Sequence, residues 1–139
     1  MPRKTDSSNP ADWLWIAAID LSVIKHAAKD EIGFITCRGK LAEVLEKIIK
    51  AELLRRGWKL VKTHDLMHLV EALAERDSDL AQPARPLCRA LAEVYFTDRY
   101  PGFDFDDPDW PALCVQLDQI TALHAAVQAR LAASGAPSP

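Results

Sequence analysis

Apolar residues recur every three or four positions through most of the chain, the spacing that places them on one face of an α-helix. Such stripes cover five segments, at about 11–29, 34–56, 63–76, 83–98 and 110–132. The segments between them lack the strict apolar–polar alternation of a half-buried strand. The pattern therefore predicts an all-α fold, an up-and-down antiparallel bundle of about five helices joined by short connectors.

Capping and breaking residues stand where these helices are expected to begin and end. Asn9 and Asp109 each precede a proline in the first helical turn, a typical helix start. Thr63 or Asp65 is expected to cap the third helix. Gly57 fits the residue after the second helix, because glycine readily adopts the left-handed conformation found there. These signals support the helix boundaries that the periodicity predicts.

The composition agrees with a single folded domain. The chain has 139 residues, of which 49% are hydrophobic and 27% charged, so it is long enough to bury a core. We expect a flexible tail over 1–10, one helical domain over 11–132 and a second flexible tail over 133–139. The first ten residues are polar and no apolar run approaches the length of a membrane span, so we expect a cytoplasmic protein without membrane contact.

The net charge of −3 excludes a strongly basic nucleic-acid binder. The charge is uneven: residues 1–64 hold 12 Lys and Arg against 8 Asp and Glu, or +4, and residues 65–139 hold 5 against 12, or −7. This asymmetry leaves open a local anion site, a dipolar surface that meets a charged partner, or charges that mix once the chain folds.

Metal sites and cofactor motifs are not supported. Cys37, Cys88 and Cys114 form no CxxC pair, so buried thiols are expected. His64 and His68 have the spacing of a two-histidine zinc site but lack its glutamate and a third ligand nearby. The acidic run at 104–109 lacks the glycine and glutamate of a calcium loop. We predict neither a metal nor a cofactor.

Two clusters could bind an anion. Lys62, His64 and Asp65 come just before a predicted helix N-terminus, where free backbone N–H groups attract negative charge, although Asp65 as the cap opposes it. Arg99 could form a bidentate pair with a phosphate and Tyr100 could stack on a base. An ordinary capped helix start and an arginine favoured by the helix dipole remain alternatives.

The second helix carries a charged face beside its apolar stripe. Glu43, Glu46, Lys47 and Lys50 have the spacing of i,i+4 ion pairs, which explains much of this charge by helix stability alone. Asp20, in the apolar stripe of the first helix, is expected to need a partner.

The order of these motifs resembles the HEPN domain family (higher eukaryotes and prokaryotes nucleotide-binding). The matches are Glu46-Lys47 with Lys50, the helix start Lys62-Thr63-His64-Asp65-Leu66, and the break Arg99-Tyr100-Pro101. The resemblance covers about 11–131 and implies a helical bundle, a homodimer and, for many members, a small nucleotidyltransferase partner in a toxin–antitoxin pair. It makes Lys47, Lys50, Lys62, His64, Asp65, Arg99 and Tyr100 candidate ligand-binding residues.

Some members of this family are metal-independent RNases with an Arg-x4–6-His motif. This chain departs from that pattern, because positions 104–106 after Arg99 hold no histidine. Arg56 and His64 are separated by seven residues, which is also outside the motif. We therefore expect no catalytic residue and a protein that binds nucleotide or RNA phosphates. The alternatives are an endoribonuclease toxin that uses Arg99 or His64, and a non-catalytic interaction or dimerisation module.

Overall fold

The computed structural model describes residues 2–94, 100–102 and 104–134. Within these residues the chain is helical and contains no strand, as the hydrophobic pattern predicts. The helices are α1 (Pro10–Lys29), α2 (Phe34–Arg55), α3 (Leu66–Glu75), α4 (Ala81–Leu91) and α6 (Trp110–Ala133). The predicted all-α bundle is confirmed.

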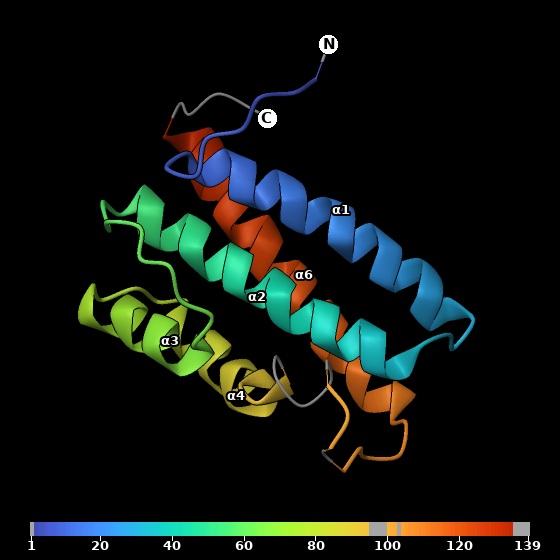
Figure 1. The fold of residues 1–139 in the computed structure, drawn as a ribbon. Helices are drawn as coiled ribbons and strands as arrows, with labels where there is room; N and C mark the ends of the chain where they lie inside the picture. The colour runs from blue at the N-terminus through green and yellow to red at the C-terminus, as the bar shows by residue number, and fades with distance from the viewer. Residues whose placement is uncertain (1, 95–99, 103, 135–139) are drawn as a thin grey trace.

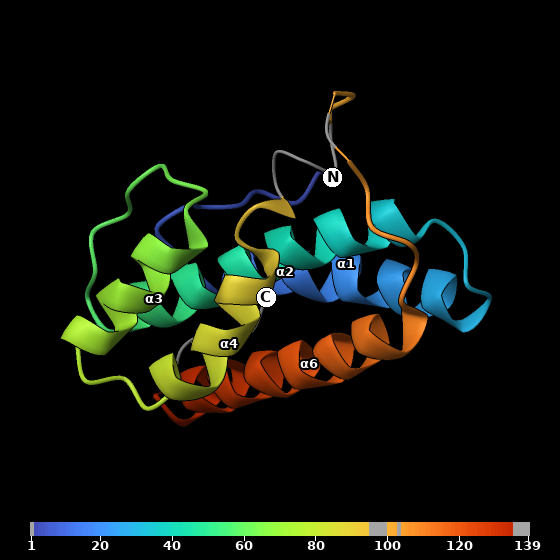
Figure 2. The same cartoon turned by 90° about the horizontal axis from the view of Figure 1, so that it is seen from below.

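Helix α2 lies at the centre of the bundle and packs against the other four helices (Figure 1). Helices α1 and α6 contact each other and one flank of α2, whereas α3 and α4 contact each other and its other flank. Figure 2 shows α6 running beneath α1 and α2, with α3 and α4 to one side. Because α2 is surrounded, it cannot present a wide solvent-facing side.

The predicted capping residues of α1, α3 and α6 are confirmed. Asn9 caps α1 by accepting a hydrogen bond from the Ala11 backbone N–H, and Asp109 caps α6 by accepting one from Ala112. Of the two candidate caps of α3, Asp65 occupies the position and accepts from the His68 backbone N–H. Gly57 follows α2 with φ of 87°, a conformation that strains residues with a Cβ.

The fourth helix differs from its prediction at both ends. It begins at Ala81 rather than Pro83, which still places Pro83 in the first turn, where its missing N–H costs no intrahelical bond. It ends at Leu91 and a turn follows at 92–93, whereas the predicted continuation over 95–98 lies outside the described residues. Val94, after the turn, is helical and buried, so the apolar stripe continues beyond α4.

A charged network lies between α2, α6 and the turn before α4. The Glu52 side chain is fully buried, with 0% exposure, on the same side of α2 as Leu45 and Ile48. Its carboxylate accepts hydrogen bonds from Arg55 on α2 and, at 2.7 Å, from Nη1 of Arg130 on α6. A buried carboxylate requires such partners, because desolvation otherwise opposes its charge.

Arg130 extends this network to the surface. Its Nη2 donates to Oδ2 of Asp79 at 2.8 Å, so one guanidinium joins a buried and an exposed carboxylate. The hydrogen bond from Arg130 holds the pKa of Asp79 below its usual range, and Asp79 and Glu52 in turn raise the pKa of Arg130. The network thus ties α6 to α2 and to the connection between α3 and α4.

Arg130→Ala is expected to destabilise the fold by about 2–3 kcal/mol, because Glu52 stays buried with only Arg55 as a charged partner. Urea denaturation followed by circular dichroism measures the change. Arg89→Ala is the matched control, since Arg89 is exposed and has no ion pair in the described residues. Equal stability of the two variants would contradict the assigned role of Arg130.

The network also predicts a pH dependence. The Asp79 pKa is lowered in the folded state, so its contribution is complete above the unfolded pKa and is lost as the pH falls through the folded value. The urea midpoint should therefore decrease between about pH 5 and pH 2, and decrease less in Asp79→Asn. Parallel pH profiles for the two proteins would show that the Arg130–Asp79 contact contributes nothing.

Candidate functional site

The candidate residues meet where the 58–65 connector returns to α2. Glu46 and Lys50, one turn apart on α2, form an ion pair with Nζ of Lys50 2.9 Å from Oε2 of Glu46. Both side chains are buried, with exposures of 9% for Glu46 and 4% for Lys50. Nδ1 of His64 lies 2.9 Å from the other carboxylate oxygen, Oε1. Glu46 therefore joins a lysine and a histidine that lie far apart in sequence.

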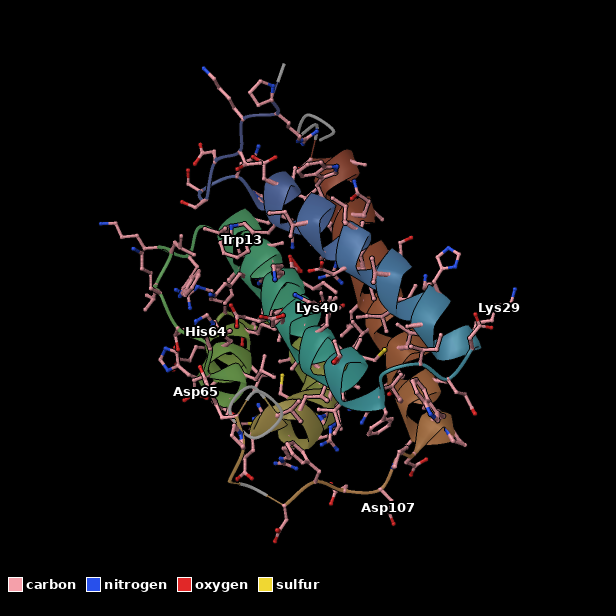
Figure 3. All side chains as sticks on the ribbon, turned by 45° about the vertical axis from the view of Figure 1, so that its right-hand side comes forward. Trp13, Lys29, Lys40, His64, Asp65 and Asp107 are labelled. Atoms are coloured by element: carbon pink, nitrogen blue, oxygen red, sulfur yellow. The ribbon has the colours of Figure 1, made fainter. Side chains whose placement is uncertain are left out.

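Helix α1 closes this cluster from the other side. Nζ of Lys50 lies 5.2 Å from the ring centroid of Trp13, within the range of a cation–π interaction. The Trp13 indole N–H donates to the Ser7 carbonyl at 2.8 Å, so the segment before α1 fixes the ring. The figure with side chains places Trp13 beside α2 and His64 at the outer edge of the cluster (Figure 3).

The geometry assigns the proton on His64. An ionised carboxylate can only accept, so the Glu46 oxygen requires the hydrogen on Nδ1 of the ring. The His64 side chain is 54% exposed, so a ligand in solvent can reach it although its inner edge is held. The result is an oriented imidazole at the start of α3.

Lys47 and Asp65 are used within the fold. Nζ of Lys47 lies 3.7 Å from Oδ2 of Asp20, which supplies the partner that Asp20 was expected to need. Asp65 caps α3, and its negative charge stands at the helix end where an anion would otherwise bind. Both side chains therefore already have a partner within the fold.

The remaining candidates lie on the surface or outside the described residues. Lys62 and Tyr100 are exposed, and Lys62 is two residues from His64. Arg99 lies outside the described part of the chain. The predicted seven-residue site is therefore divided: Lys50 is buried, Lys47 and Asp65 have structural partners, and Lys62 and His64 remain as exposed neighbours.

The remaining groups with predicted chemistry are the potential metal ligands and the cysteine thiols. Within residues 2–94, 100–102 and 104–134, no group of three or more His, Cys, Asp or Glu side chains could hold a metal ion. Cys37 and Cys88 are buried, as expected, but Cys114 is only partly buried, so the expectation is wrong for that residue. Burial raises the pKa of Cys88 to about 12. Such a thiol stays protonated and unreactive near neutral pH.

The sequence pattern did not identify the burial of Glu46, Lys50 and Glu52. For Glu52 a signal existed, because it continues the core positions Leu41, Leu45 and Ile48 at helical spacing. For Glu46 and Lys50 the i,i+4 spacing fits a buried ion pair and a solvent-exposed one equally well. Only the packing of α1 and of the 58–65 connector shows that this pair is buried. The predicted Glu46–Lys50 pair is confirmed, whereas Lys47 reaches Asp20 and Glu43 pairs with Lys40.

Glu46→Ala is expected to destabilise the protein by about 3 kcal/mol, because it leaves the Lys50 ammonium buried without its carboxylate. The double substitution Glu46→Leu with Lys50→Met should recover most of this loss, since it removes both buried charges at similar volume. Thermal and urea unfolding measure both effects. A double variant that is as unstable as Glu46→Ala would contradict this account of the pair.

Comparisons with known proteins complete the description of the site. No helix among the described residues is both long and apolar enough to cross a membrane. Comparison with curated proteins and with solved structures gives no significant match. The family model described as "HEPN domain" matches residues 11–127, which covers the bundle from α1 through most of α6 and includes the Glu46–Lys50–His64 cluster. On this match the chain belongs to the HEPN domain family.

Proposed function

We propose that this HEPN domain binds the phosphate group of a nucleotide or of RNA at the surface formed by Lys62 and His64. The observation that supports the proposal most directly is the contact between Glu46 and Nδ1 of His64, which orients an exposed ring two residues from the exposed Lys62. A ring that is already oriented loses less conformational freedom on binding than a freely rotating side chain does. Lys62 adds a mobile positive charge that suits a phosphate.

The proposed ligand contact is limited by neighbouring charge. The Asp65 carboxylate caps α3 and lies next to His64 in the sequence, so it opposes an approaching anion. The binding is accordingly expected to be modest in affinity and sensitive to salt.

The family membership supports the wider setting of this function. We propose that the domain acts as a homodimer beside a nucleotidyltransferase-type protein, in a toxin–antitoxin-like pair, and that it binds rather than cleaves its ligand. The support for the non-catalytic role is the sequence, in which positions 104–106 after Arg99 hold no histidine. Sedimentation equilibrium tests the homodimer, because it gives the molar mass in solution directly.

Isothermal titration with ATP and with a short RNA measures the proposed binding. The affinity is expected to fall roughly three- to tenfold in Lys62→Gln and in His64→Asn, because each variant removes one contact at an exposed surface. Lys59→Gln is the matched control, since Lys59 is exposed on the same connector and has no recorded ion pair in the described residues. Its affinity should equal that of the wild type.

Two outcomes would oppose this function. No heat of binding at millimolar ATP or with RNA would exclude the ligand. Cleavage of RNA in EDTA by the wild type, lost in His64→Ala, would favour the endoribonuclease alternative instead, since a histidine acid or base requires no metal.

A further inference from the structure

The outward side of α1 carries a second group of potential anion ligands. Ser22, Lys25, His26 and Lys29 are all exposed and together line a shallow surface hollow. Their spacing of three, four and seven residues places the four side chains on one stripe of the helix. We call these four residues the α1 stripe.

The α1 stripe lies well away from the surface proposed for nucleotide binding. Figure 3 shows Lys29 at one end of the molecule and His64 on the side opposite to it. Helix α2 lies between the two in this view. A ligand at the α1 stripe would therefore not compete directly with one at Lys62 and His64.

The cations of the α1 stripe differ from those of the central helix. Every lysine and arginine of α2 has a carboxylate within 4 Å: Arg38, Lys40, Lys47, Lys50 and Arg55. Across the described residues, by contrast, Lys25, His26 and Lys29 have no recorded ion pair. The chain has 20 acidic and 17 basic residues, yet no carboxylate of the described residues forms an ion pair with these neighbouring side chains.

Helix electrostatics explains only part of this arrangement. His26 and Lys29 occupy the last turn of α1, where the negative end of the dipole favours cations. Lys25 stands before that turn, and Ser22 adds a hydroxyl donor to the same hollow. Asp30 and Glu31 follow directly and reduce the long-range positive field, so a ligand must be held by short contacts with the donors themselves.

The dimensions of the stripe indicate the kind of anion. Seven residues separate Ser22 from Lys29, which corresponds to about 10 Å along a helix axis and exceeds the size of one phosphate group. Ammonium, imidazole and hydroxyl groups are all donors for phosphate oxygens. Val23, 62% exposed, lies beside the stripe and offers an apolar contact next to the charged one.

We propose that Ser22, Lys25, His26 and Lys29 form a second anion site that binds adjacent phosphate groups. Lys25 and Lys29 contact the phosphates as point charges, while Ser22 and His26 donate hydrogen bonds between them. The ligand is a nucleotide polyphosphate or consecutive phosphates of an RNA strand, which share this chemistry.

The test is an NMR titration of the full chain with pyrophosphate, with ATP and with a short single-stranded RNA. Each effective ligand is expected to shift the signals of residues 22–29, and Lys25→Gln with Lys29→Gln should weaken binding there roughly tenfold, about threefold per ammonium group. A response to RNA but not to pyrophosphate or ATP would identify the strand as the source of the phosphates. A response to all three would identify the shared polyphosphate chemistry.

The matched control is Lys59→Gln with Arg89→Gln, which removes the same charge at exposed positions outside the stripe and should leave the titration unchanged. No shift at residues 22–29 with any of the three ligands would overturn the proposal, as would equal weakening in the control. A shift caused only by a peptide rich in aspartate would also overturn it. Because the signals of residues 62–64 are read in the same spectra, failure at either site is distinguishable from failure at the other.

Discussion

The fold depends on the need to satisfy two buried carboxylates of the central helix. Glu46 and Glu52 lie inside the bundle, and a carboxylate in such a place is stable only with positive or donating partners. Within the described residues these partners come from three different segments: His64 from the connector before α3, Arg130 from α6, and the neighbouring turns of α2 itself. Each contact fixes how one segment lies against α2, so charge specifies the arrangement while apolar burial supplies most of the stability.

The sequence predicts the fold class and the helices of the described residues well, because periodicity and caps are local signals. Asn9, Asp65 and Asp109 act at the helix starts adjacent to them, and their hydrogen bonds are those the residue types suggest. The end of α4 was less predictable, because Val94 is helical and buried after the turn at 92–93 and so continues the apolar stripe. A hydrophobic stripe indicates which side faces the core, and a short turn can interrupt the helix without changing that side.

The candidate site was less predictable for a different reason. The sequence selects Lys47, Lys50, Lys62, His64 and Asp65 by residue type and order, but it does not say which charges meet. Lys50 is charged yet buried, and its partner Glu46 was not among the candidates. Pairing over long sequence distances depends on packing, so the sequence names candidate residues while the structure shows which of them are buried, paired or exposed. Family membership leaves the ligand open, since a fold alone does not specify activity.

The segment that precedes α1 is connected to the exposed His64 ring by a series of side-chain contacts. The Ser7 carbonyl accepts a hydrogen bond from the Trp13 indole, and the Trp13 ring lies beside the Lys50 ammonium. Lys50 forms an ion pair with Glu46, and the Glu46 carboxylate contacts the His64 ring. Arg3 and the backbone N–H of Asp6 both bond the Asp12 carboxylate, so this segment is attached at more than one point. A continuous series of contacts through the interior of the bundle therefore joins the start of the chain to the exposed imidazole.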